Sequence, residues 1–277
     1  MRIFETIKPK DNTLKKYISY YYVDVADNED YFNEYICYPH YNNTVSLYKS
    51  HVLSCDEGHS HITFNNGYLP LQIFTPLREE ILKVTQEGPV YKIGIVFKPF
   101  GINQFLRQDV KMDTLASSPS FQFFENDFLL ELFSELNIEC AINMLEKQLL
   151  ENFSNIENSY VTRAIELLHE PENEFGIDAL AETKIGISRK HLNRLFQKYI
   201  GTTPQTYRKI VRFRQLMDFK LNAAKENNYG ALSYQVNYAD QSHFIKACKQ
   251  LTNLTPSQFF KEGKLVGSED TFWNFNQ

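Results

Sequence analysis

A predicted helix from about residue 188 to 198 carries side chains that are suited to hydrogen bonding with nucleic-acid bases. Its apolar stripe consists of Leu192, Leu195 and Phe196, and its outer face carries Arg189, Lys190, Asn193, Arg194 and Gln197. Arginine can donate two hydrogen bonds to guanine, and asparagine or glutamine can form a bidentate pair with adenine. This face therefore has the chemistry to contact base edges, although a merely solvated helix face is the alternative.

The residues before this helix predict a helix-turn-helix unit that would present it. A helix from about residue 177 to 184 directs Ile177, Leu180 and Ala181 inward, and a short turn follows at residues 185–187. Ser188 is a suitable N-cap because its side-chain oxygen can accept an otherwise unpaired backbone N–H in the first turn.

A similar pattern recurs later in the chain, at about residues 230–251. Asp240 can cap its second helix, while Phe244 and Cys248 face inward. The two copies also end alike, with GTTP at 201–204 and NLTP at 253–256. A long helix from about 204 to 221 would join them, and the two recognition helices could then enter successive major grooves about 34 Å apart.

These residues give the chain a resemblance to a known family. The segments LAETKIGISRKHLNRLFQKYIGTTPQTY, RFRQ and NYADQSHFIKACKQLTNLTP resemble the AraC/XylS family of transcription regulators, over roughly residues 159–262. The resemblance implies that base edges are contacted by Lys190, Asn193 and Arg194 of the first unit and by Gln241, Ser242, Ile245 and Lys246 of the second. The second unit departs from the family pattern at Ser233, Asn237, Cys248 and Asn253. Asparagine tolerates the left-handed backbone that glycine usually supplies, so we expect the turns to survive.

The charge of the chain is distributed unevenly. The overall net charge is −5, but residues 1–159 carry 13 Lys/Arg against 22 Asp/Glu, a net charge of −9, whereas residues 160–264 carry 16 against 10, a net charge of +6. Attraction to phosphates is local, so a basic domain can bind DNA beside an acidic one.

The N-terminal part has a different pattern. Short runs such as TVSLY, HITF, LQIF and YKIGIVF, separated by turn-like segments, predict a β-rich barrel or sandwich up to about residue 113, with an early helix at about 14–21. Residues 121–153 predict two helices, and the polar segment 152–158 predicts a boundary. This part resembles an uncharacterised barrel-like sensor module that precedes such DNA-binding domains, which implies a role in regulation or dimerisation.

We therefore expect an α+β chain of two domains. Residues 1–154 would form a β-rich regulatory domain that ends in a helical pair, and residues 159–264 an all-α DNA-binding domain with helices at about 160–169, 177–184, 188–198, 204–221, 230–236, 241–251 and 256–262. The helical pair carries more apolar residues than one buried stripe needs, which favours a homodimer contact, with docking onto the β-rich core as the alternative.

An enzyme is the competing hypothesis. Cys55, His59 and His61, with His40 and His51 nearby, would suit a metal-dependent β-barrel, and the many tyrosines before residue 50 would suit a small-molecule pocket. The chain has no Walker loop, GxSxG elbow or HExxH helix. We therefore assign no catalytic residue, metal or cofactor, and keep as the alternative a small-molecule-binding or metal-dependent β-barrel enzyme with an accessory DNA-binding domain.

The remaining expectations concern place and partners. The four cysteines are scattered without a CxxC, and no signal peptide or membrane-spanning run is evident, so we expect a cytoplasmic protein. Its expected partners are double-stranded DNA and a second copy of the chain, and the interpretation also allows RNA polymerase and an unknown small-molecule effector.

Overall fold

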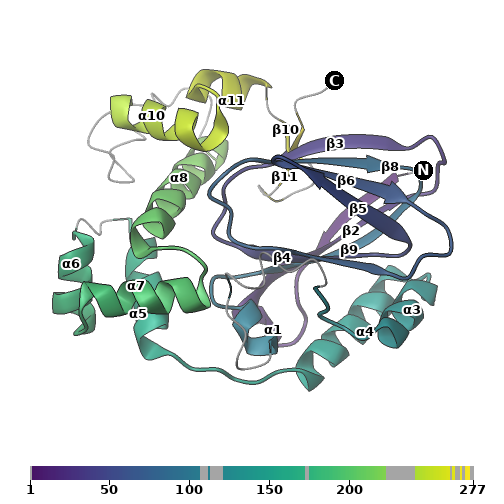
Figure 1. Ribbon diagram of the computed structural model, residues 1–277, viewed down its shortest axis with the longest axis horizontal. Coiled ribbons are helices and arrows are strands. Elements are labelled where there is room, and N and C mark those ends of the chain that lie inside the picture. The colour runs from purple at the N-terminus through teal and green to yellow at the C-terminus, as the bar shows by residue number, and fades with distance from the viewer. Residues whose placement is uncertain are drawn as a thin grey trace.

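The computed structural model has two β-sheets in its N-terminal part and helices in its C-terminal part (Figure 1). It describes residues 2–106, 112, 121–171, 175–222, 241–262, 264–265, 269 and 272–274. The predicted α+β architecture is thereby confirmed.

The first sheet has five strands, and all neighbours in it are antiparallel. Their order is β1 (Arg2–Ile7), β2 (Ile18–Ala26), β9 (Val90–Phe97), β4 (Asn43–Tyr48) and β7 (Leu71–Thr75). These segments are rich in β-branched and aromatic residues, which pack well on a pleated surface. In the pairing of β2 with β9, Asp24 lies opposite Lys92.

The second sheet has six strands and includes the C-terminal end of the chain. Its order is β10 (Lys264–Leu265), β11 (Phe272–Asn274), β3 (Phe32–Cys37), β8 (Leu82–Glu87), β6 (His59–Phe64) and β5 (His51–Asp56). The sequence did not predict these two strands, which lie at the end of the predicted all-α domain, residues 159–264, and beyond it. Strand β11 pairs with β3 through Phe272 opposite Cys37 and Trp273 opposite Ile36. These strands satisfy backbone groups along β3 that an uncovered edge strand would leave unpaired.

The two sheets face each other and stay separate, as in a sandwich. Side chains from both sheets form a shared core, which includes Tyr20, Tyr22 and Tyr48 from the first sheet and Tyr35 and Val84 from the second. This core contains more tyrosine than is usual for a protein interior, and it also receives polar and charged side chains that are described below.

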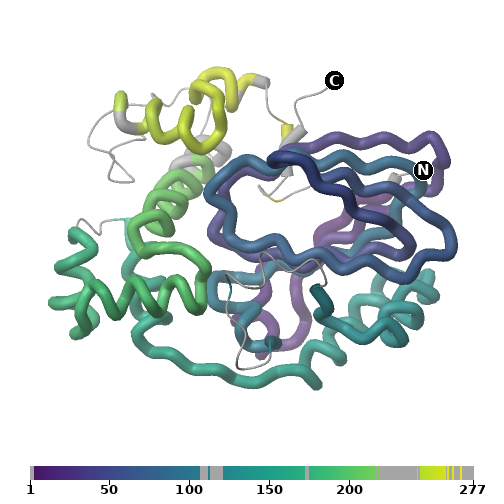
Figure 2. The backbone as a smooth tube through the Cα atoms, viewed as in Figure 1, coloured from purple at the N-terminus to yellow at the C-terminus, as the bar shows by residue number. Residues whose placement is uncertain are grey.

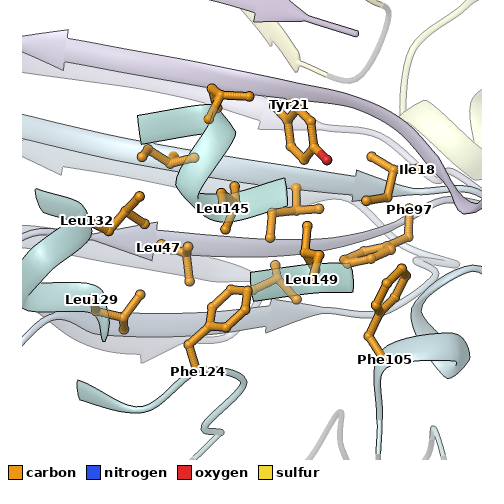
Figure 3. Packing of buried hydrophobic residues seen from close by; sticks show 14 of the residues in the cluster. Ile18, Tyr21, Leu47, Phe97, Phe105, Phe124, Leu129, Leu132, Leu145 and Leu149 are labelled. Atoms are coloured by element: carbon orange, nitrogen blue, oxygen red, sulfur yellow. The ribbon is translucent and has the colours of Figure 1, made fainter. Parts of the chain in front are cut away.

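The opposite face of the five-stranded sheet is covered by α3 (Asn126–Ser134) and α4 (Ile138–Glu151) (Figure 3). Leu129, Leu132 and Phe133 of α3 are buried against the sheet. The predicted helical pair is therefore present, but most of its apolar residues dock on the sheet. Leu130 (51% exposed) and Leu136 (88% exposed) remain at the surface.

The early helix is shorter than predicted. Helix α1 ends at Tyr17, and strand β2 begins at Ile18. Leu14, Tyr17, Ile18 and Tyr21 do have helical spacing, but the following residues YYYV alternate between the two faces of the sheet and pair with β9. Pairing with a neighbouring strand overrides the local helical pattern.

The C-terminal helices agree closely with the predicted ones. They are α5 (Ser159–His169), α6 (Ile177–Ala179) with its π-helical continuation η2 (Leu180–Ile185), α7 (Arg189–Tyr199), α8 (Pro204–Asn222), α10 (Gln241–Thr252) and α11 (Pro256–Glu262). The helix predicted at about 230–236 lies outside the described residues. A short 3-10 helix, η1 (Ile102–Phe105), follows β9. Figure 2 shows the extended connection from α4 to α5. Within the described parts of the chain, no helix is both long and apolar enough to cross a bilayer.

Candidate nucleic-acid interface

The first helix-turn-helix unit is built around the turn at residues 186–188. Gly186 has a positive φ of 82°, and the N–H groups of Gly186 and Ile187 both donate to the carbonyl of Ala181, at 2.9 and 3.0 Å. Glycine adopts this left-handed conformation without steric cost. Ser188 Oγ then accepts the N–H of His191 at 3.2 Å. The predicted N-cap at Ser188 is confirmed, and it fixes where α7 begins.

Helix α7 has one buried and one exposed face. Leu192 and Phe196 are fully buried among residues of α5, α6 and α8. The side chains of Arg189, Lys190, Arg194 and Gln197 are exposed, and Asn193 is partly exposed. Arg189 is also in an ion pair with Asp178 on the preceding helix, at 3.0 Å. The five predicted donors therefore do share the solvent side of α7, while their contact with DNA stays a prediction.

The second unit is described from α10 onward. Phe244 and Cys248 are buried as predicted, Ser242 and Lys246 are exposed, and Ile245 is partly exposed. Gln241 begins the helix. Asp240, Ser233 and Asn237 lie outside the described residues.

The two units end in the same local structure. Gly201 has φ 89° and Asn253 has φ 59°, so asparagine does adopt the left-handed conformation at the position where the first unit has glycine. Thr203 Oγ1 accepts the N–H of Thr206 at 3.2 Å, and Thr255 Oγ1 accepts the N–H of Gln258 at 3.3 Å. In each unit a proline then occupies the first position of the next helix, where its missing N–H costs nothing.

Helix α8 belongs to both units. Tyr207, Ile210 and Val211 are part of the core around α7, whereas Phe213 and Met217 belong to the core around α10 and α11. A single rigid helix thus carries both units, which limits how far one can move without the other.

The N-terminal part holds α8 through Arg214. This guanidinium is 1% exposed, and it donates to the carbonyls of Pro39, from Nε at 2.7 Å, and of Tyr38, from Nη2 at 3.0 Å. The Tyr38 ring also packs against Phe259 of α11, with centroids 4.8 Å apart. This role was not predictable from the sequence, because the segment RFRQ gives no sign that its second arginine is buried.

Further contacts connect the N-terminal part with the first unit. Leu77 and Phe100 join the core around α7, and the hydroxyl of Thr202 donates to Glu79. The Tyr41 ring lies edge-on to His169, which is hydrogen-bonded to the hydroxyl of Tyr207 at 2.7 Å. Burial, with a smaller contribution from His40, lowers the pKa of His169 to about 4. Its ring is therefore neutral at pH 7, as suits an interface with few counter-charges.

The histidines that suggested a metal site are differently engaged. The rings of His59 and His61 are tilted by 35° with centroids 3.8 Å apart, His59 is hydrogen-bonded to Thr85 at 2.7 Å, and Nε2 of His61 lies 3.6 Å from Oδ2 of Asp56. His51 is bonded to the carbonyl of Pro89 at 3.1 Å. Among the described residues, no three histidine, cysteine or carboxylate side chains come together as metal ligands would.

Comparison with known proteins identifies the helical part. Residues 182–262 match the family model described as a helix-turn-helix domain. An uncharacterised HTH-type transcriptional regulator of Haemophilus influenzae is 32% identical over 123 residues, which are 44% of this chain and 40% of the relative, so the match spans well under half of that protein.

Two solved structures are also similar. One is a transcriptional regulator with an AraC-type DNA-binding domain from Chromobacterium violaceum, with 23% identity over 36% of this chain and 87% of that chain and a TM-score of 0.33. The other is ToxT from Vibrio cholerae, with 12% identity over 86% of this chain and 97% of that chain and a TM-score of 0.44. The match to the family model agrees with the local structure described above, and residues 182–262 of this chain are a helix-turn-helix domain.

Proposed function

We propose that the protein is a one-component transcription regulator that binds specific DNA sites in the cytoplasm. Residues 159–264 would bind the DNA, and residues 1–154 would control that binding. The main observation behind the proposal is the exposed face of α7. The buried residues Leu192 and Phe196 fix this helix in the core, and its other face exposes cationic and amide side chains to solvent.

Specific roles follow for the side chains of both recognition helices. We infer that Lys190, Asn193 and Arg194 contact bases from α7, and that Gln241, Ser242, Ile245 and Lys246 do so from α10. Arg189 and Gln197 would contact the edges of the same site. The ion pair of Arg189 with Asp178 is exposed, so exchanging it for a phosphate contact costs little.

The test of the proposal is binding of the full chain to genomic DNA fragments, followed by footprinting to find the preferred site. Affinity should fall at least about tenfold between about 50 and 200 mM salt, because cationic side chains displace counterions from phosphates. Fluorescence anisotropy with labelled duplex measures this. Absence of binding, or binding that is indifferent to salt, would contradict the proposal.

Replacing Arg194 or Lys190 with alanine should weaken binding to the preferred site by about 1–3 kcal/mol each, because each loses contacts to a base edge. The fold should be unaffected, since both side chains are exposed. Lys147→Ala on α4 is the matched control, because it removes an exposed lysine far along the chain from α7. If Arg194→Ala left the preference among sites unchanged, α7 would not be oriented as proposed.

We also propose that the protein forms a homodimer through α3 and the residues that follow it. Leu130 and Leu136 are the exposed leucines of this surface, and a dimer would bring two DNA-binding domains to a repeated site. Light scattering should give twice the mass of the chain for the wild type and the monomer mass for Leu130→Glu with Leu136→Glu. A wild-type protein that is monomeric at micromolar concentration would contradict the dimer.

A further inference from the structure

A cavity lies between the two sheets of the N-terminal part. The space between atoms there is about 420 Å³, including its open mouth. Part of this space is open to solvent, so the enclosed part is smaller, and only a small molecule would fit there. The lining includes three tyrosines, several hydroxyl groups and two cationic side chains, Lys92 and Arg78.

Lys92 lies within a cage of aromatic rings. Its Nζ is 4.9 Å from the ring centroid of Tyr22, 5.0 Å from that of Tyr48 and 5.5 Å from that of Tyr35, and it donates to the Tyr35 hydroxyl at 3.0 Å. The lysine is 3% exposed. Burying an ammonium group is costly, and the cation–π contacts and the hydrogen bond to Tyr35 offset part of that cost.

Gly94 makes this cage possible. A Cβ atom at this position would lie 2.0 Å from two atoms of the Tyr22 ring. Only glycine therefore lets the ring lie flat over β9, beside Lys92. The arrangement of lysine and tyrosines depends on a residue that has no room for a side chain.

Arg78 supplies a second cation on the same cavity. Its Nε is buried and donates no hydrogen bond to any of the residues that the structure describes. A buried donor without an acceptor costs free energy that an entering acceptor would recover. Burial raises the pKa of the Cys37 thiol in the cavity wall, and the charges of Arg78, Lys92 and Arg214 oppose that rise, so several cations lie around this thiol.

The balance of charge around the cavity is positive. Asp24 is buried and lies opposite Lys92 in the register of β2 with β9, and the described residues that line the cavity include no acidic side chain. One carboxylate against Lys92 and Arg78 leaves a net positive charge. The rest of the wall includes apolar side chains, namely Ile62, Ile73, Leu82 and Val84.

We propose that this cavity binds a small organic acid, with its carboxylate between Arg78 and Lys92 and its apolar body on the aliphatic wall. The inference rests on the proposed regulatory role of the N-terminal part, and it specifies the chemical class of the effector. A carboxylate satisfies the guanidinium through charge-assisted hydrogen bonds and places its charge beside the ammonium.

Residues next to the cavity lining contact the DNA-binding part directly. Arg78 lies between Leu77, which packs in the core around α7, and Glu79, which accepts the hydroxyl of Thr202. On the other side, Tyr35 and Cys37 of β3 line the cavity, and the carbonyls of Tyr38 and Pro39, directly after β3, accept hydrogen bonds from Arg214 of α8. An acid that repositions Arg78 or β3 therefore acts on both segments that hold the helix-turn-helix units, which couples its binding to that of DNA.

The experiment is isothermal titration of the full chain with hexanoate, phenylacetate and 3-phenylpropanoate, and with the corresponding neutral amides. At least one acid should bind saturably and at least about tenfold more tightly than its amide. Arg78→Gln and Lys92→Met should each reduce the affinity for the acid to that for the amide. Lys49→Gln, which removes an exposed lysine at the end of β4, should leave it unchanged. If Lys92→Met does not fold, the affinity of Arg78→Gln for the acid is the deciding measurement. Arg78 is only half-buried, so its replacement should leave the fold intact.

Binding to the preferred DNA site is measured with the same samples. The bound acid should change the DNA affinity of the wild type at least about fivefold, and this change should disappear in Arg78→Gln. Equal affinity for acids and amides, no binding of any acid, or an acid that binds without changing DNA affinity would overturn the inference. DNA binding that persists in those cases keeps the proposed function intact, whereas absence of DNA binding contradicts the proposed function itself.

Discussion

Replacing Leu192 with alanine is expected to lower the free energy of unfolding by about 2–5 kcal/mol and to abolish specific DNA binding. The side chain is fully buried in the core between α5, α7 and α8. Its removal loses apolar contacts and leaves a cavity that the rigid surroundings fill only in part. Because the same core orients the exposed face of α7, its donors would no longer be held in place.

Urea unfolding followed by circular dichroism measures the first effect, and anisotropy with the preferred duplex measures the second. Leu69→Ala is the matched control, because this leucine is 59% exposed and lies outside the proposed dimer surface, so its truncation should change stability by less than about 0.5 kcal/mol. A Leu192→Ala protein as stable as this control would show that α7 does not pack as described.

Replacing Arg214 with methionine is expected to separate the two parts of the chain. Methionine keeps much of the packing volume, but it cannot donate to the carbonyls of Tyr38 and Pro39. Hydrogen bonds from a charged donor contribute about 1.5–3 kcal/mol each, and the two carbonyls would be left buried without their partner. We expect a loss of about 3 kcal/mol or more, concentrated at the interface between the sheets and α8.

Calorimetry tests this through the shape of the unfolding transition. The wild type should unfold in one cooperative transition, whereas Arg214→Met should show two, since the parts lose their main polar connection. Arg163→Met is the control, because Arg163 forms only an exposed i, i+3 ion pair with Glu166 at 3.1 Å. A single unshifted transition in Arg214→Met would mean that the apolar contacts of Tyr38, Leu77 and Phe100 suffice to hold the parts together.

The first helix-turn-helix unit and the described end of the second could be predicted from the sequence because their determinants are local. The stripe of Leu192 and Phe196 follows from helical periodicity, the start of α7 from the cap at Ser188, and the left-handed turn at Asn253 from the tolerance of asparagine for positive φ. Each depends on residues within one or two helical turns. Tertiary contacts therefore change these helices and turns little.

The shape of the N-terminal part was predicted only in outline. The alternation of aromatic and β-branched residues indicates strands, but it does not say which strands pair. The helical spacing of apolar residues gave a wrong prediction at Ile18–Tyr21, where β2 replaces the second half of the predicted helix through pairing with β9. The return of the chain end to β3 had no local signal, because β10 and β11 have only two and three residues.

The sequence by itself determined the first helix-turn-helix unit, helices α10 and α11, the cationic face of α7 and the β-rich character of the first half. Only the tertiary structure decided that Arg214 would be buried on the carbonyls of Tyr38 and Pro39, and that Lys92 would lie among three tyrosines between the sheets. The reason is that a charged side chain is placed at the surface by default, since burial is costly. The partners that offset this cost are residues distant in sequence; Arg214 and Pro39, for example, are 175 positions apart. Such residues meet only when the sheets and helices have packed.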